Sequence, residues 1–231
     1  IGVDYGTLSG RAVLLNIETG ELVAQAVKEY THGVMDKSLP SGRRLGEDWA
    51  LQHPVDYLEV LYETIPAIIA ASGVEKSDVI GISTDFTACT MLPVYKDGTP
   101  LCMTEKYADE PNAYIKLWKH HAAQDQASRL NSIAEMRGES FLKRYGGKIS
   151  SEWLIPKIME TLEEASEVYE DTYSFMEAAD WIVMQLCGVM ARNTCCAGYK
   201  ALWSKELGYP DESFFKALDP RLEKLTSEKL K

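Results

Sequence analysis

The first thirty residues alternate between apolar and polar positions, which is typical of β-strands. The alternation predicts three short strands, at residues 1–5, 11–17 and 21–30, with turns between them. Because connections this short force neighbouring strands to run antiparallel, the three strands form a meander. Glycine, proline and scattered charge over residues 32–48 predict a long loop after it.

Helical spacing of apolar residues begins after this loop. It runs from Leu58 to Ile69, with Pro66 as an expected kink and Gly73 as an expected stop. Further apolar segments predict strands at residues 79–83, 91–95 and 173–176. Further helices are expected over residues 112–137 and over residues 178–186, the latter ending before Gly188. Another helix is expected to begin at a cap formed by Ser151 and to end at Leu162, with Pro156 in its first turn.

The order of these elements indicates the fold class. A strand-strand-strand-helix-strand unit opens a ribonuclease H-like domain, whereas a doubly wound fold alternates strand and helix from its start. We therefore expect an α/β fold with a mixed five-stranded sheet, opened by the three-strand meander and flanked by helices.

Composition narrows the class of protein. The chain has 231 residues, of which 45% are hydrophobic and 26% charged, so it can bury a substantial core. Its net charge of −11, without a stripe of lysine or arginine, argues against nucleic acid or an anionic membrane as partner. It contains neither an apolar run of about 18 residues nor a visible secretory signal. The chain starts with Ile1 inside an apolar run, which leaves an upstream targeting segment open.

The cysteines indicate a reducing compartment. Their number is odd and no Cys-x-x-Cys motif occurs, which is typical of free thiols in a cytoplasmic protein. The adjacent pair of Cys195 and Cys196 is either a redox pair or, as we favour, two small packed residues.

The segment Asp4-Tyr5-Gly6-Thr7 is the strongest chemical motif. A carboxylate at the end of a buried strand is costly unless it is paired or faces a cation, so Asp4 is a candidate for Mg²⁺ or its waters. Gly6 and Thr7 can turn N–H groups and a hydroxyl toward phosphate oxygens, and Arg11 on the next strand can add a positive charge. An ordinary hairpin turn is the alternative.

Polar and small residues follow the predicted strand at 79–83. Asp85 can accept hydrogen bonds from sugar hydroxyls, and the small Ala88 permits close approach of a ligand to the backbone. A turn capped by the aspartate explains the same residues equally well.

Two later segments carry further candidates. On a helix, His120 and His121 would point about 100° apart, which argues against one shared metal ion. Trp118 is either a stacking wall for a sugar ring or a core residue. Lys200 follows a run of small uncharged residues and is either a ligand contact or a solvated surface lysine.

These motifs resemble a known family. Residues 4–7 and Ser9-Gly10-Arg11 resemble the first phosphate motif of the sugar kinases with the FGGY signature, a motif shared by all actin-like ATPases. More specific segments resemble the ribulokinase branch of that family, and they lie at residues 85–90, 116–123, 145–153, 179–182 and 197–200. Glycerol kinases and xylulokinases carry other residues where this chain has Phe86-Thr87-Ala88.

The resemblance implies a reaction. Residues 1–231 would form the N-terminal ribonuclease H-like domain of a two-domain enzyme that binds sugar and ATP in the cleft between its domains. The enzyme would use Mg-ATP to phosphorylate L-ribulose at its C5 hydroxyl, giving L-ribulose 5-phosphate in L-arabinose catabolism. The catalytic-base aspartate would lie in the second domain, so that residues 1–231 alone would be inactive.

The resemblance also implies roles for single residues. Asp4 would organise Mg²⁺ through water, while Gly6, Thr7 and Arg11 would contact the γ-phosphate. On the sugar side, the implied contacts are the Ala88 backbone and Lys200, with Asp85 and Trp118 as weaker candidates.

Three rival functions remain open at this point. The first is another kinase of the same family, such as a xylulokinase. The second is a non-catalytic actin-like module that binds nucleotide. The third is a ribonuclease H-like nuclease, which needs a carboxylate cluster for two metal ions that Asp4 and Asp85 could begin. The oligomeric state is open as well, with a homodimer as one option.

Overall fold

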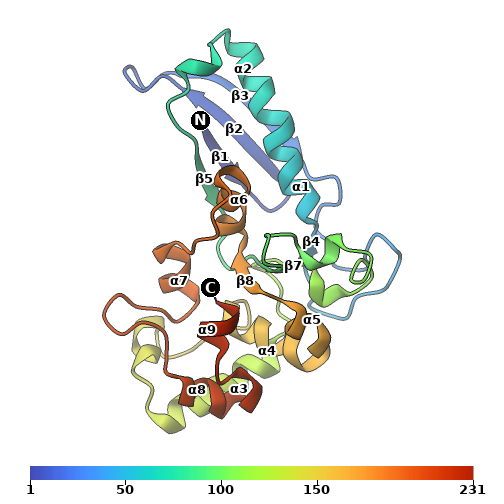
Figure 1. The fold of residues 1–231 in the computed structure, drawn as a ribbon, viewed down its shortest axis with the longest axis vertical. Coiled ribbons are helices and arrows are strands. Elements are labelled where there is room, and N and C mark those ends of the chain that lie inside the picture. Colours follow the sequence, from blue (N-terminus) through green and yellow to red (C-terminus); the bar gives the residue numbers. More distant parts are fainter. Residues whose placement is uncertain (231) are drawn as a thin grey trace.

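A mixed four-stranded sheet forms the first lobe of the molecule (Figure 1). In the computed structural model, which describes residues 1–230, the strands lie in the order β3-β2-β1-β5. They are β1 (Gly2–Tyr5), β2 (Ser9–Leu15), β3 (Leu22–Glu29) and β5 (Ser83–Phe86). The first three form the predicted antiparallel meander, and β5 runs parallel to β1.

The prediction of five strands in this sheet was wrong. The strand expected at residues 79–83 begins only at Ser83, and the next one, β6 (Met91–Val94), belongs to a second sheet. That sheet is antiparallel and has the order β4-β7-β6-β8, with β4 (Leu51–Gln52), β7 (Ile115–Lys116) and β8 (Ser174–Glu177). The turn at residues 87–90 carries the chain from one sheet to the other, so β6 cannot pair with β5.

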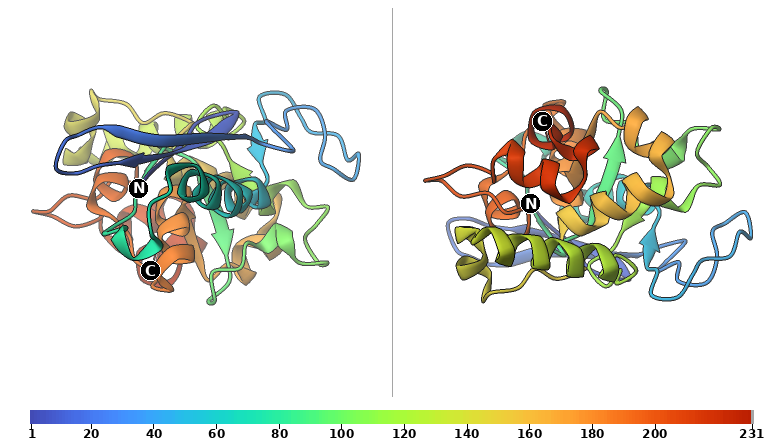
Figure 2. Two further views of the ribbon diagram at one scale, coloured as in Figure 1. Left: turned by 90° about the horizontal axis from the view of Figure 1, so that it is seen from above. Right: turned by 90° about the horizontal axis from the view of Figure 1, so that it is seen from below.

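The predicted helix after the long loop covers one face of the first sheet (Figure 2). It consists of α1 (Pro54–Glu59), a π-helical turn η1 (Val60–Thr64) and α2 (Ile65–Ser72). The π-turn ends two residues before Pro66, which has no N–H to continue the helical ladder. The helix ends at Gly73 (φ 69°), as predicted. A side chain at Gly10 would come within 2.5 Å of Val60, so glycine on β2 allows the helix to approach.

The second lobe is mainly helical (Figure 1). Its longest helix, α3 (Gln124–Arg137), is shorter than the predicted 112–137, because the chain first forms a 3₁₀ turn and β7. The next helix, α4 (Leu154–Glu164), has Trp153 rather than Ser151 as its cap residue, and Pro156 lies in its first turn as expected. The others are α5 (Ser166–Asp171), α6 (Ala178–Cys187), α7 (Thr194–Lys200), α8 (Glu212–Leu218) and α9 (Leu225–Lys229).

Short 3₁₀ turns connect several of these elements: η2 (Lys76–Asp78), η3 (Leu101–Met103), η4 (Pro111–Ala113), η5 (Ser140–Tyr145) and η6 (Pro220–Leu222). None of the helices between residues 1 and 230 is long and apolar enough to cross a membrane. All five cysteines carry free thiols: Cys89, Cys102, Cys187, Cys195 and Cys196.

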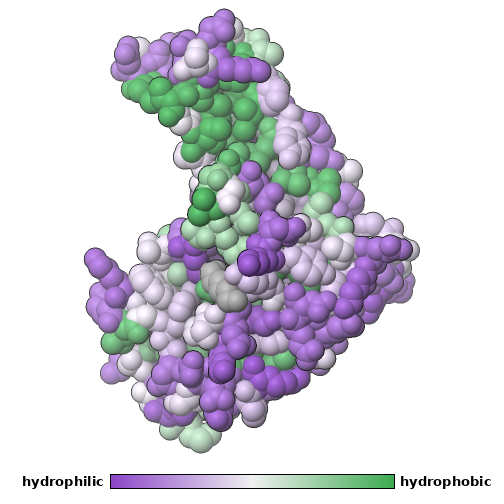
Figure 3. Space-filling model, in the orientation of Figure 1, coloured by the Kyte–Doolittle hydropathy of each residue, from purple (hydrophilic) through white to green (hydrophobic). Residues whose placement is uncertain are grey.

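The two lobes enclose a hollow, and apolar side chains gather above it (Figure 3). The exposed apolar residues on the first lobe include Ile17, Ile80 and Ile82, which are 74%, 78% and 44% exposed. They line a groove of about 770 Å³ at the start of β1, at the opposite end of that strand from Asp4-Tyr5-Gly6-Thr7. The groove and the predicted motifs are therefore separate features of the first sheet.

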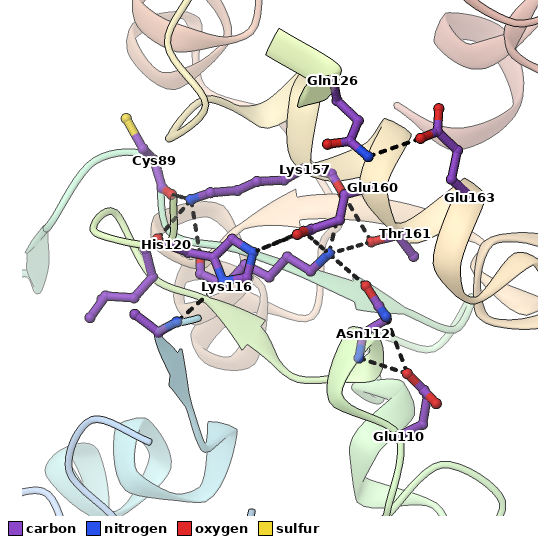
Figure 4. Close-up of polar contacts among 12 residues, drawn as sticks. Cys89, Glu110, Asn112, Lys116, His120, Gln126, Lys157, Glu160, Thr161 and Glu163 are labelled. Carbon is purple, nitrogen blue, oxygen red and sulfur yellow. Dashed lines mark hydrogen bonds and ion pairs between the residues drawn. The ribbon is translucent and has the colours of Figure 1, made fainter. Parts of the chain in front are cut away.

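A buried polar network lies between β7 and α4 (Figure 4). The side chains of Lys116 and Glu160 are fully buried, and Lys116 Nζ lies 2.6 Å from Glu160 Oε2. Lys116 also donates to Asn112 Oδ1 at 2.7 Å and Thr161 Oγ1 at 2.9 Å, and His120 Nε2 lies 2.8 Å from Glu160 Oε2. Because each charge meets several partners, the network offsets the cost of removing these groups from water.

Burial and neighbouring charges set the protonation of this network. Burial lowers the pKa of His120 to about 4, against the pull of the Glu160 carboxylate. Burial would raise the pKa of Glu160, but Lys116 and His120 outweigh that effect and hold it at about 2. At neutral pH the network therefore contains a neutral His120 and an ionised Glu160.

His120 makes stability depend on pH in a defined window. The unfolded chain protonates this histidine near its ordinary pKa of 6.5, and the folded chain only near 4, so the unfolded state binds more protons between these values. We expect the free energy of unfolding to fall by about 3 kcal/mol as the pH drops through this window. Urea unfolding at several pH values, monitored by tryptophan fluorescence, measures this change in the free energy of unfolding.

A histidine variant pair isolates this contribution. The variant His120→Asn should lose that part of the pH dependence, whereas His121→Asn, at a histidine that is about half exposed, should retain it. An unchanged pH dependence in the His120 variant would show that another group is responsible.

Candidate functional site

The turn between β1 and β2 holds the predicted phosphate motif. The Gly6 N–H donates to Ser9 O at 3.0 Å, and a side chain at Gly6 would lie 3.2 Å from that oxygen, which explains the glycine. The backbone N–H groups of Thr7 and Leu8 donate to no acceptor within residues 1–230. The donors left for a ligand are therefore those of Thr7 and Leu8, while Gly6 closes the turn.

Surrounding side chains hold this turn in place. The fully buried Gln52 donates from Nε2 to Thr7 O at 2.8 Å, and Tyr30 donates from its hydroxyl to Gly6 O at 2.9 Å. Trp118 donates from Nε1 to Thr7 Oγ1 at 3.1 Å. Because three separate elements contribute these bonds, the turn is fixed before any ligand arrives.

A row of charged side chains crosses the first sheet beside this turn. Asp4 on β1 is the register partner of Arg11 on β2 and of Asp85 on β5. All three residues are exposed on the face that α1 and α2 leave uncovered. Two neighbouring carboxylates next to a guanidinium suit a divalent cation with a phosphate group, because carboxylate oxygens and bound water are what Mg²⁺ prefers. The site residues therefore fit the metal that the resemblance implies.

The turn at residues 87–90 brings the predicted sugar contacts close to this row. It follows β5 directly, and Thr87 N–H donates to Tyr5 O at 3.2 Å. Ala88 is exposed, whereas Cys89 is buried and has a left-handed backbone (φ 65°). Burial, with the nearby Glu177, raises the pKa of the Cys89 thiol to about 12, so this thiol is a poor nucleophile.

Trp118 does not lie on a helix or in the core. The segment 116–121, expected to be helical, forms the end of β7 and a turn, and the Trp118 side chain is 38% exposed. Its bond to Thr7 links the candidate sugar wall to the phosphate turn. The two histidines have different partners, although not on the helix from which their divergence was predicted: His120 bonds to Glu160, and His121 Nε2 lies 3.6 Å from Glu152.

Lys200 lies at the end of α7. Its Nζ lies 4.4 Å from the ring centroid of Trp153 and also 4.4 Å from that of Tyr199. It forms no ion pair with an acidic residue in the described part of the chain. The charge of Lys200 acts against burial and lowers the pKa of the Cys89 thiol.

The structure adds residues that the sequence reasoning missed. Trp153 forms one wall beside Lys200, and Gln52 holds the phosphate turn. Trp153 was visible only as part of the resemblance over residues 145–153. The sequence contains one signal for Gln52, which is that this polar residue stands between an apolar pair and Pro54. That pattern does not distinguish a buried amide from a loop residue.

Comparison with known proteins now bears on this arrangement. The sequence profile described as "FGGY family of carbohydrate kinases, N-terminal domain" matches residues 1–227. This chain belongs to the FGGY family of carbohydrate kinases. It is 60% identical to the ribulokinase of Bacillus licheniformis and 58% identical to that of Halalkalibacterium halodurans. These matches cover 96% and 100% of this chain, which spans 41% of the length of each relative.

Solved structures of the FGGY family share the fold. The gluconate kinase of Lactobacillus acidophilus has a TM-score of 0.70 at 18% identity, and its match covers 94% of this chain and 39% of that one. The xylulose kinase of Rhodospirillum rubrum has a TM-score of 0.69 at 17% identity and covers 94% and 40%. The α/β fold is therefore that of the actin-like ATPases, as the resemblance implied.

Proposed function

We propose that this chain is the N-terminal domain of a ribulokinase, an enzyme that transfers the γ-phosphoryl group of ATP to the C5 hydroxyl of L-ribulose. The observation that carries the proposal is the identity of 60% to a ribulokinase over 96% of the chain. The match to the family profile over residues 1–227 includes both candidate segments, the phosphate turn and the 87–90 turn. A cytoplasmic location agrees with the five free thiols.

The arrangement of side chains supports a division of roles. Asp4, with Asp85 beside it, would hold Mg²⁺ through water, and the cation would neutralise charge on the phosphate oxygens. The free N–H groups of Thr7 and Leu8 would donate to those oxygens, and Arg11 would add positive charge. Catalysis in this class is mostly positioning and charge neutralisation, so a rigid turn is what the reaction requires.

The sugar side would be formed by the second group of residues. The exposed Ala88 backbone and the Lys200 ammonium would donate or accept bonds at sugar oxygens, and the Trp118 face would pack against the carbon chain. Trp118 bonds to Thr7, so the sugar wall and the phosphate turn share one hydrogen bond. This link would keep the C5 hydroxyl and the γ-phosphate in one fixed relation. The base that removes the hydroxyl proton would come from the rest of the enzyme.

A substrate panel tests the proposal. The full-length enzyme should release ADP fastest with L-ribulose when it is compared with D-xylulose, D-ribulose and glycerol at equal concentration with Mg-ATP. Residues 1–231 alone serve as the inactive control. A preference for D-xylulose would favour a xylulokinase, and ATP binding without phosphorylation of any sugar would favour a non-catalytic module.

Partners follow from the same proposal. Small molecules, the sugar and ATP, are the expected ligands, and the net charge of −11 makes nucleic acid an unsuitable one. Size-exclusion chromatography with light scattering on the full-length enzyme distinguishes a homodimer from a monomer.

A further inference from the structure

Lys157 on α4 is a buried cation held mainly by backbone carbonyls (Figure 4). Its side chain has no exposed surface, and Nζ donates to Cys89 O at 2.6 Å and to Leu117 O at 2.7 Å, with Lys116 O at 3.4 Å. It forms no ion pair within the described residues. Lys116, beside it, pairs instead with Glu160.

This position is an expensive one for a charge. Burial lowers the pKa of Lys157 to about 8, which reflects the cost of keeping the ammonium away from water. Much of α4 around it in the sequence is apolar and buried, including Leu154, Ile158 and Met159. A methionine would fill the same space without that cost. The reason for a lysine must therefore lie in the carbonyls that it binds.

Both strong bonds of Lys157 end in segments of the candidate sugar site. Cys89 follows Ala88, and Leu117 precedes Trp118. Cys89 is also held in the left-handed region (φ 65°), which is costly for a residue with a side chain. A hydrogen bond to the Cys89 carbonyl orients the peptide between Cys89 and Thr90 and so helps to hold Cys89, next to Ala88, in that conformation.

We propose that Lys157 is a positioning residue for the sugar subsite, where it clamps the 87–90 turn and the segment at 117–118 to α4. This inference rests on the proposed function, because it takes Ala88 and Trp118 as sugar contacts. The phosphate turn touches the clamp through the bond from Trp118 to the Thr7 hydroxyl, but its backbone is held separately, because its own carbonyls accept from Gln52 and Tyr30. Loss of Lys157 should therefore affect the sugar far more than ATP.

The variant Lys157→Met in the full-length enzyme tests whether the loss of Lys157 affects sugar binding more than ATP binding. We expect the KM for the sugar to rise at least tenfold, with the KM for ATP changed by less than about twofold. Lys116→Met is the matched control, because Lys116 is equally buried but donates mainly to Asn112, Glu160 and Thr161, with a longer bond of 3.4 Å to the backbone carbonyl of Lys157. The control should lower the melting temperature and leave the sugar KM within about twofold.

Hydrogen exchange provides a readout that needs no substrate. Amides in peptides covering residues 86–91 and 117–119 should exchange faster in Lys157→Met than in the wild type, and those of β1 to β3 should not. If the wild type prefers another sugar in the panel, the proposed function fails, but the KM for that sugar and the exchange rates still test the clamp.

Two outcomes would overturn the inference. One is an unchanged sugar KM together with unchanged exchange at residues 86–91. The other is loss of folding in both Lys157→Met and Lys157→Gln, the latter of which retains an amide donor, because Lys157 would then support the whole lobe and not the turn.

Discussion

Replacing Asp4 with asparagine in the full-length enzyme is expected to lower kcat by about 100-fold or more, with little change in the KM for the sugar. Asparagine has nearly the same shape but no negative charge, so it can no longer attract the cation that accompanies the phosphates. Loss of one preorganised electrostatic contact of this kind typically costs about two to three decades in rate. Steady-state kinetics with the sugar and Mg-ATP varied separately measure both constants.

The structure explains why this change should leave the fold intact. Asp4 is exposed in the row with Arg11 and Asp85, and its carboxylate makes no hydrogen bond to the rest of residues 1–230. Removing an exposed charge changes stability by less than about 0.5 kcal/mol. The melting temperature of the variant should match that of the wild type.

A neighbouring carboxylate serves as the control for Asp4. Glu29 on β3 is exposed, and its register partner is Ser9, away from the Asp4 row. The variant Glu29→Gln removes the same charge from the same sheet and should keep kcat. If Asp4→Asn kept kcat and lost only sugar affinity, the phosphate role of Asp4 would be wrong.

Local sequence patterns were enough to predict much of the fold. The meander, the kinked helix before Gly73 and the helix that ends at Gly188 all follow from periodicity and from turn residues, which act within a few positions of the chain. The same local rules failed at residues 112–123. Apolar residues there satisfy a helical period, but pairing of β7 with β4 and β6 overrides it, and such pairing is set by residues far away in the sequence.

The sequence identified single residues of the candidate site but not how these residues are arranged in space. The sequence singled out Asp4 and Asp85 separately, yet their adjacency depends on the parallel pairing of β1 with β5, about 80 positions apart. The bond from Trp118 to Thr7 joins residues 111 positions apart. Lys157 was missed for another reason: a lysine beside an apolar stripe is usually solvated, and only the packing of α4 shows that it is not.

The variant Lys200→Ala in the full-length enzyme is expected to lower kcat/KM for the sugar by about 10–100-fold without affecting folding. A lysine at this position can donate to sugar oxygens, and a charge-assisted hydrogen bond contributes about 1.5–3 kcal/mol, or about one to two decades. The rings of Trp153 and Tyr199, each 4.4 Å from Nζ, hold the ammonium without neutralising it. Its donors therefore stay available to a ligand.

Lys205 provides the matched control, because it is an exposed lysine a few residues beyond α7. The variant Lys205→Ala should keep both kcat/KM and the melting temperature, since it removes a solvated charge. If Lys200→Ala also left both quantities unchanged, Lys200 would be a surface lysine, and the cation–π contacts would only restrict its side chain. A fall in kcat/KM at constant melting temperature, seen for Lys200 alone, requires that its ammonium meets the sugar.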